Sequence, residues 1–285
     1  MKQSNAWAAL KKDGPIVCLD ADCTVSPDYL IKASQAFADH SVNVAHFKFQ
    51  HDLSLQADDN LRAGIVAYEL HLRCYVQGLK KAGYFFAIHT IGSCMAVRSS
   101  SYARAGGMNK KTAGEDFYFL HKLIPHGGWK YIDAMVYPSS RISDRVPFGT
   151  GRAQLEWLEN STGGFTYNIE VYKVMEALFK ATKKWFLNEI ILDEFHPILQ
   201  RFLTKVNARQ RISELRRQST SLETFEKRCR QWMDGFWVLK LTHYLRDNGF
   251  PNQPVELVAK SILNINSESR EELLNQLRSI DYLEP

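Results

Sequence analysis

The chain has 285 residues, of which 45% are hydrophobic and 24% are charged. This is the composition of a packed globular protein, and it excludes a disordered chain, a collagen-like repeat and a small disulfide scaffold. Thirty-six lysine and arginine residues against 31 aspartate and glutamate residues leave a formal net charge of +5. So small an excess suits an anionic small molecule as well as a polyanion, and it argues for neither. We expect no nucleic-acid partner.

The cysteines and the apolar stretches restrict the cellular setting. The chain has five cysteines without a CxxC spacing, which argues against a disulfide framework and against a zinc knuckle. Its first residues lack the apolar core of a secretory signal. The longest notable charge-free stretch, 82–97, has 16 residues, whereas a membrane span needs ~20 apolar residues. We therefore expect a soluble, cytoplasmic protein made in a reducing compartment.

The first half of the chain alternates apolar runs with helical patterns. Residues 15–20 form an apolar run that predicts a buried strand ending in acidic residues. The same criteria predict, in order, a helix that opens at Ser26-Pro27, a strand at 42–49, a helix at 58–81, a strand at 93–98, a short helix at 99–105, a helix at 115–124 and a strand at 129–136. Strands that alternate with helices predict an α/β layered domain.

The second half of the chain has a different pattern. Glycine almost disappears between Gly164 and Gly235, and helical periodicity dominates to the C-terminus. We therefore expect an α/β domain over residues 1–154 and an α-helical appendage over residues 155–285. Residues 201–230 hold nine basic and three acidic side chains. A solvated helix face is the plain interpretation, and a surface for anionic lipids or a protein partner is the alternative.

Two acidic residues follow the first apolar run directly. Asp20 and Asp22 are one residue apart where the predicted strand ends, and open α/β sheets bind ligands at the carboxyl ends of their strands. Two such carboxylates can face one hard cation. Mg²⁺ and Mn²⁺ take oxygen ligands and leave room for substrate phosphates. The alternative is that both are turn residues that cap the next element.

The string Asp20-Ala-Asp22-Cys-Thr24-Val25 resembles the first motif of haloacid-dehalogenase-type phosphatases. That resemblance implies that Asp20 is a nucleophile and Asp22 a general acid. The family also needs a late acidic pair that follows a third apolar strand, and the helical second half shows no strand to present one. A phosphatase with Asp20 as its nucleophile is therefore the alternative function.

A second resemblance covers roughly residues 15–152 and includes several motifs. The segment Ile91–Arg98, the Gly106-Gly107 pair and the string Gly114-Glu115-Asp116 follow one another at the spacing found in family 2 glycosyltransferases of the GT-A fold. The acidic pair precedes them, as it does in that family. The resemblance implies a GT-A-like mixed sheet flanked by helices, and transfer of a sugar from a nucleotide-sugar donor to a glycan, lipid or small-molecule hydroxyl acceptor.

The same resemblance implies roles for the acidic residues. Asp20 and Asp22 would hold the divalent cation, Mg²⁺ or Mn²⁺, that bridges the donor's diphosphate. Asp116 matches the base that takes the proton from the acceptor hydroxyl in an inverting transfer, and Glu115 would support it. Burial would raise the pKa of Asp116 and make it a better base. The structural alternative is that acids in the first turn stabilise a helix.

The remaining candidate contacts lie in glycine-bearing segments. We expect Gly92 and Ser93 to contact the donor or the acceptor. The alternative for Gly92 is that it only satisfies a backbone turn. Residues 140–152 form a basic loop after the last predicted strand, which is either a plain connection or a loop that folds over the diphosphate. Its candidates for bidentate phosphate contacts are Arg141, Arg145 and Arg152.

The chain departs from the family in two ways. Family members carry β-α units of ~30 residues each with the nucleotide-base site before the acidic pair, but only 19 residues precede Asp20. We therefore expect a domain truncated at its N-terminus, which is a split or mis-started gene product, a fragment, or a remnant that pairs with a second chain supplying the missing portion. The Gln-x-x-Arg-Trp signature is not found after residue 116, which disfavours a processive synthase. Association with the inner membrane face and a non-catalytic binding role are further alternatives.

Overall fold

A computed structural model describes residues 13–108, 114–145, 147–159, 164–187 and 190–282. The chain divides into two compact units, and both are discontinuous in sequence. Unit 1 comprises residues 1–69, 88–164 and 274–285, and unit 2 comprises residues 70–87 and 165–273. The expected domain boundary near residue 154 stays a prediction.

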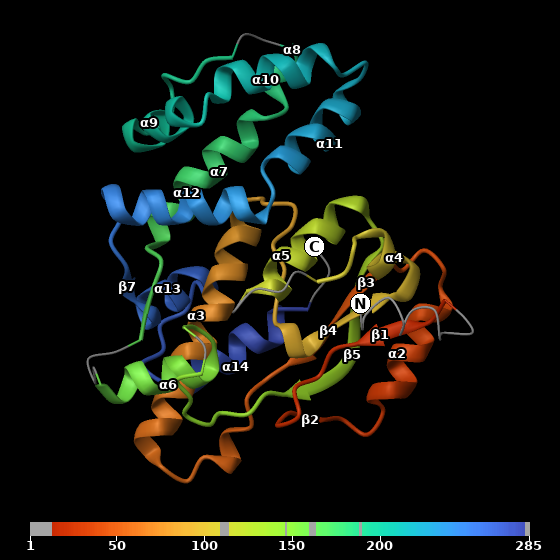
Figure 1. Cartoon of the computed structure of the whole chain (residues 1–285). Helices are drawn as coiled ribbons and strands as arrows, with labels where there is room; N and C mark the ends of the chain where they lie inside the picture. The colour runs from red at the N-terminus through yellow and green to blue at the C-terminus, as the bar shows by residue number, and fades with distance from the viewer. Residues whose placement is uncertain (1–12, 109–113, 146, 160–163, 188–189, 283–285) are drawn as a thin grey trace. The chain divides into compact units, whose positions relative to one another are not determined.

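Unit 1 is built on a mixed five-stranded sheet (Figure 1). Its strands are β1 (Pro15–Val17), β2 (Thr24–Val25), β3 (Val44–Phe49), β4 (Met95–Arg98) and β5 (Trp129–Tyr137). They lie side by side in the order β1-β4-β3-β5-β2. The β3–β5 pair is parallel and the other neighbouring pairs are antiparallel. A mixed sheet flanked by helices confirms the predicted α/β class.

Burial differs along the sheet. The middle strand β3 is buried on both faces, since Val44, Ala45 and Phe47 have no exposed surface, and this explains its nearly continuous apolar sequence. The first strand, β1, was expected to be buried but is only half-buried. Leu19, two residues beyond it, is 43% exposed. Within the described residues β1 pairs on one side only, with β4, so it forms an edge of the sheet.

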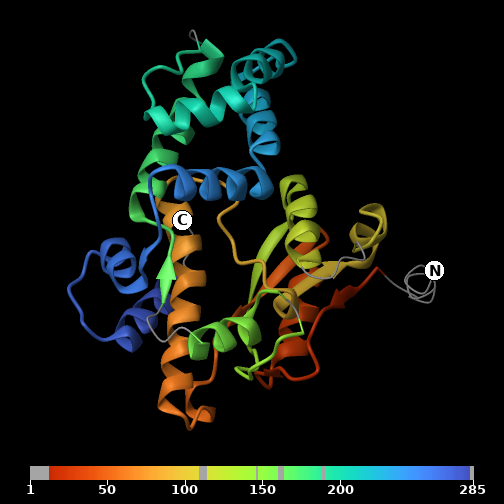
Figure 2. The same cartoon turned by 60° about the vertical axis from the view of Figure 1, so that its left-hand side comes forward.

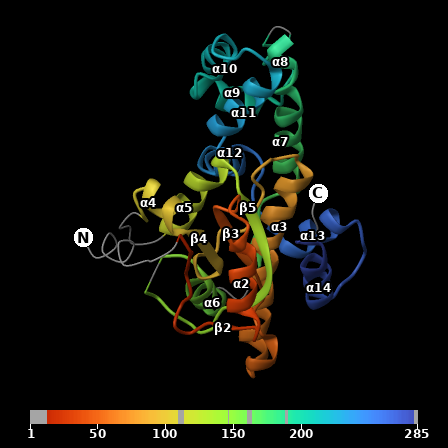
Figure 3. The same cartoon turned by 90° about the vertical axis from the view of Figure 1, so that its right-hand side faces the viewer.

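Helices cover the sheet of unit 1. Helix α2 (Tyr29–Ala38) packs against β5 and β1, as Figure 3 shows, and the Tyr29 ring stacks on Phe47 with centroids 4.1 Å apart. The other helical elements that contribute to unit 1 are η1 (Leu53–Leu55), α3 (Asp59–Lys81), η2 (Gly92–Cys94), α4 (Ser99–Arg104), α5 (Glu115–Leu123), η3 (Ile124–His126), α6 (Thr150–Glu159) and α14 (Arg270–Ile280). Helices α3 and α14 each have residues in both units.

Arg98, the last residue of β4, has a structural role. Its side chain is buried, and its guanidinium group donates hydrogen bonds to four backbone carbonyl oxygens, those of Asp13, Phe37, Asp39 and Val42. Because these bonds satisfy the buried guanidinium group and reach carbonyl oxygens in three separate segments, Arg98 ties those segments to the end of the strand. The arginine in the glycine-led motif therefore stabilises the fold.

Unit 2 is mainly helical, as its sequence predicted. Helix α10 packs against α9 and α11, and α12 contacts α7 and α9; these helices run from green to blue in Figure 2. The elements are β6 (Phe165–Thr166), α7 (Ile169–Ala181), α8 (Lys184–Leu187), α9 (Pro197–Lys205), α10 (Ala208–Arg217), α11 (Leu222–Trp232), α12 (Gly235–Asn248), β7 (Gln253–Pro254) and α13 (Val255–Leu263). The short β6–β7 pair was not predicted.

The basic segment 201–230 lies on α9, α10 and α11. Several of its charges are paired along their own helix, for example Arg211 with Glu214 and Arg230 with Glu226. Among the helices that the structure describes, none combines the length and the apolar character that crossing a bilayer requires. Association of this surface with a membrane stays a prediction.

Candidate active site

The acidic pair lies in a tight turn after β1. The turn is closed by a hydrogen bond from the Cys23 backbone N–H to the Asp20 carbonyl oxygen, at 3.0 Å. Asp20 and Asp22 are both exposed there. One carboxylate oxygen from each and the Cys23 sulfur lie within 4.8 Å of one another. Ligand atoms bound at ~2.0–2.3 Å from one ion lie about this close together, so the three side chains fit a divalent cation.

Cys23 was not among the candidates from the sequence. Its thiol stands beside two carboxylates, which are the ligands that suit Mg²⁺ and Mn²⁺. A sulfur ligand favours softer ions. Two carboxylates and one thiol thus form a donor set that fits a divalent cation.

Asp116 is the second residue of α5 and is partly buried. Its Oδ1 accepts a hydrogen bond from the Phe117 backbone N–H at 2.7 Å, and the Gly92 N–H also donates to its carboxylate. Burial is the main reason why the pKa of Asp116 is raised above its ordinary value, and the nearby charge of Glu115 adds to it. This is the direction that a general base requires.

Asp116 and the acidic pair lie at the same end of the sheet. The thiol of Cys18 lies near both. Burial is the main cause that raises the pKa of this thiol to about 11, and the charges of the Asp20 and Asp116 carboxylates contribute to the same shift. Ser93 provides a second link, since its hydroxyl hydrogen-bonds the Cys23 side chain and the preceding residue, Gly92, donates to Asp116. The structure thus brings together the two acidic motifs that are far apart in sequence.

The close approach of Asp116 leaves no room for a side chain at position 92, which explains the glycine there. Its φ is not positive, so no turn requires a glycine at this position. A Cβ added there would stand 2.8 Å from Oδ2 of Asp116 and 3.1 Å from its Cβ. By contrast, Gly106 and Gly107 have φ values of 75° and 73° and serve a left-handed turn.

Gly92→Ala is expected to displace the Asp116 carboxylate and to lower kcat by about 10–100-fold, because small misplacements of reacting groups have effects of this size. Metal-dependent nucleotide binding should be unchanged. The matched control is Gly14→Ala, since a Cβ at Gly14 meets nothing within 4 Å. Equal kcat values for the two variants would contradict this role of Gly92.

The three candidate arginines differ in what they contact. Nε of Arg141 lies 2.7 Å from Oδ2 of Asp22, and the Arg141 side chain is 57% exposed. Arg152 instead pairs with Glu156 one turn along α6, at 2.8 Å. Arg145 is exposed. Arg141 is therefore the arginine that the structure places at the acidic pair.

Tyr68, which lies near Asp116, and its partner Thr150 belong to no recognisable sequence motif. The hydroxyl of Tyr68, on α3, hydrogen-bonds Thr150, the first residue of α6. Burial and the charge of Asp116 together raise the pKa of Tyr68 to about 12. In the sequence Tyr68 is one apolar position in a long helical pattern, and only its contacts distinguish it from a core residue.

Comparison with known proteins shows the family. No curated protein and no solved structure matches the chain. A sequence model described as Glycosyl transferase family group 2 matches residues 15–247, which is well over half of the chain. The phosphatase alternative would need a late apolar strand that ends in acids, and beyond β5 the described residues contain only the two-residue strands β6 and β7. The chain therefore belongs to the family 2 glycosyltransferases, and its α/β unit has the GT-A-like mixed sheet.

Proposed function

We propose that this chain transfers a sugar from a nucleoside diphosphate sugar to a hydroxyl acceptor, with inversion at the anomeric carbon and with a divalent cation at Asp20 and Asp22. The observation that supports this most is that Asp116 and the acidic turn lie at the same end of the β1–β4 pair. The Cys18 N–H donates to the Met95 carbonyl oxygen at 3.0 Å, and Gly92, three residues before Met95, lies against Asp116. Membership of the family supports sugar transfer. The two acidic sites supply the base and the cation ligands that such a reaction uses.

Asp116 is the proposed base. The acceptor oxygen forms a bond to the anomeric carbon while its proton passes to a carboxylate oxygen of Asp116, and the bond from that carbon to the diphosphate breaks. A single displacement of this kind inverts the configuration. The N–H groups of Gly92 and Phe117 hold the carboxylate in place, and the raised pKa brings the base closer to the operating pH.

Asp20, Asp22 and Cys23 are the residues that would hold the cation. When bound, the cation neutralises the negative charge that develops on the leaving diphosphate. Arg141 lies beside Asp22 and is more than half exposed. Its planar group can donate two parallel hydrogen bonds to phosphate oxygens, so it would stabilise the same charge.

The test is a panel of nucleoside diphosphate sugars assayed with Mn²⁺ and a hydroxyl acceptor over a range of pH. We expect acceptor-dependent release of the nucleoside diphosphate. Its rate should fall as the pH decreases through the raised pKa of Asp116, because the protonated carboxyl cannot accept a proton. Circular dichroism at each pH checks that the chain stays folded. A rate that persists undiminished down to the ordinary aspartate pKa of about 3.9 would exclude Asp116 as the base.

A further inference from the structure

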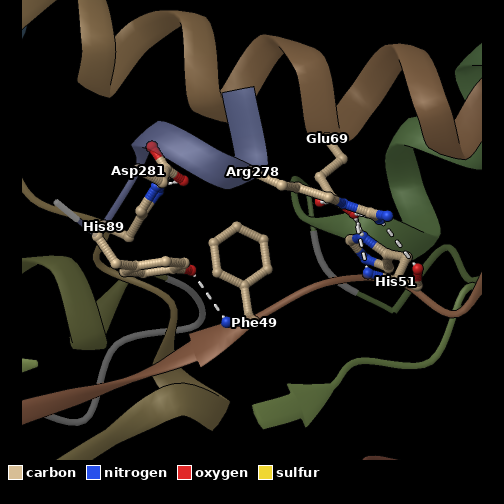
Figure 4. A network of polar contacts seen from close by, with 7 residues as sticks. Phe49, His51, Glu69, His89, Arg278 and Asp281 are labelled. Carbon is tan, nitrogen blue, oxygen red and sulfur yellow. Dashed lines mark hydrogen bonds and ion pairs between the residues drawn. The ribbon is translucent and has the colours of Figure 1, made fainter. Parts of the chain in front are cut away.

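Residues 274–282 belong to unit 1. One of them, Asp281, lies beside the buried side chain of His89. Oδ2 of Asp281 lies 2.7 Å from Nε2 of His89, and neither side chain is more than 2% exposed. A carboxylate can only accept, so Nε2 carries the hydrogen. Figure 4 shows the two side chains pointing toward each other, with the ring of Phe49 between this pair and the other polar residues. A buried carboxylate is unfavourable without such a partner.

His89 begins a short segment that leads to the proposed base. Two residues later, the Ile91 N–H donates to Nε2 of His46 at 3.2 Å. Nδ1 of His46 lies 2.6 Å from the Phe47 carbonyl oxygen, so Nδ1 carries the hydrogen of this ring and Nε2 is free to accept. The next residue, Gly92, lies against Asp116, since a Cβ added to it would stand 2.8 Å from Oδ2 of that carboxylate. The segment 89–92 is therefore held at one end by Asp281 and at the other by the base.

A second buried group lies on the other side of Phe49. Arg278 donates from Nε and Nη2 to the two carboxylate oxygens of Glu69, at 2.7 and 2.8 Å. The same carboxylate accepts from the backbone N–H of His51 at 2.9 Å and lies 2.9 Å from its Nδ1. Nε2 of His51 is 3.3 Å from the Thr150 hydroxyl, which also bonds Tyr68. The second branch thus ends at Thr150 and Tyr68, and the charge of Asp116 acts on the Tyr68 hydroxyl.

We propose that Asp281 and Arg278 are positioning residues for the acceptor side of the reaction. Asp281 acts through His89 on Gly92, and Arg278 acts through Glu69 and His51 on Thr150. This assignment rests on the proposed function, since the first branch holds Gly92 against Asp116 and the second holds Thr150, the partner of Tyr68. Asp281 and Arg278 themselves do not contact the acidic turn, which is joined to the segment 89–92 through Ser93 and Cys23, so we expect their loss to affect the rate of transfer more than donor binding.

Asp281→Ala should lower kcat by about 10–100-fold through misplacement of the base, while KM for the nucleotide sugar stays within about twofold. Asp281→Asn keeps an acceptor oxygen for His89 and should restore most of the lost rate. Arg278→Ala should likewise lower kcat at constant donor KM. The control is Ser279→Ala on the same helix, because the Ser279 hydroxyl bonds only locally, to the Gln276 carbonyl oxygen.

Amide hydrogen exchange of the full-length variants tests the coupling without any need for activity. In Asp281→Ala we expect the amides of residues 89–92 to exchange at least about tenfold faster, with protection of β3 and α3 retained, which shows that the fold persists. In Asp281→Asn and Ser279→Ala exchange in this segment should match the unsubstituted chain.

The two hypotheses fail in different ways. If exchange in Asp281→Ala accelerates only within residues 274–282 and residues 89–92 are unchanged, the positioning role is overturned. An equal fall of kcat in Asp281→Ala and Ser279→Ala would overturn it as well. The other outcome is that exchange in the segment 89–92 accelerates as expected but the unsubstituted protein turns over no nucleotide sugar. The structural coupling of Asp281 to this segment is then supported, and the proposed function is contradicted.

Discussion

Asp116→Asn is expected to lower the rate of sugar transfer by about 10²–10⁴-fold, the contribution typical of a general base. Asparagine has the same size and keeps an oxygen for the N–H groups of Phe117 and Gly92, but it cannot take the proton of the acceptor. Product formation from a nucleotide sugar and an acceptor is the measurement. Nucleotide binding in the presence of Mn²⁺, followed by calorimetry, should be unchanged.

The control for this variant is Asp133→Asn. Asp133 lies on β5, its side chain is 74% exposed and its contact is with Lys48, so the same chemical change occurs at a residue with no proposed part in the reaction. Full transfer activity in Asp116→Asn would remove Asp116 from the role of base. A loss of both transfer and nucleotide binding would instead indicate that Asp116 helps to hold the donor.

Replacement of Asp20 and Asp22 by alanine should remove metal-dependent nucleotide binding. The two carboxylates are two of the three clustered ligands, so we expect a larger loss than the roughly 10–100-fold seen when an outer partner of a metal ligand is removed. Calorimetry with a nucleoside diphosphate is the measurement, with Mn²⁺ and then with a chelator. The chelator should weaken binding by the unsubstituted chain and leave the double variant unaffected.

Asp144→Ala provides the matched control for the acidic turn. Asp144 is an exposed acid in the basic loop, three residues from Arg141, and its loss changes the net charge near the site without removing a proposed ligand. An Mn²⁺ response in the double variant equal to that of the control would contradict the metal site and, with it, the metal-dependent part of the proposal.

The elements with a strong local periodicity were predictable from the sequence. The expected strand at 42–49 is β3 (Val44–Phe49), and the expected helix at 58–81 is α3 (Asp59–Lys81). Both patterns repeat over enough residues to separate a period of two from a period of 3.6. The strand at 129–136 is β5, one residue longer than expected.

The sequence did not predict features that depend on neighbours. The two-residue strands β2, β6 and β7 are too short to show a period of two. The partial exposure of β1 was missed for a related reason, because a run of apolar residues looks the same in a central strand and in an edge strand. Which of the two it becomes depends on how many strands pair with it.

The same distinction applies to the candidate site, where local motifs were predictable from the sequence and contacts between distant residues were not. The acidic pair, Glu115 and Asp116 were visible as motifs because their spacing is local. Cys23 lies in the same turn, but nothing in the sequence distinguished a ligand from a small buried side chain. The contact between His89 and Asp281 joins residues 192 positions apart, so no local pattern contains it.

Residues 274–282 complete unit 1 although the rest of that unit lies before residue 165. Because a chain is synthesised from its N-terminus, the sheet, His89 and Glu69 are made long before Asp281 and Arg278 exist. During this interval His89 lacks its partner Asp281, and Glu69 has His51 but lacks Arg278, and contacts of such sequence separation form slowly. Maturation of the unit that holds the acidic residues is therefore tied to translation of the helical half, and a premature stop codon just before residue 278 would leave an α/β unit without the contacts of Asp281 with His89 and of Arg278 with Glu69.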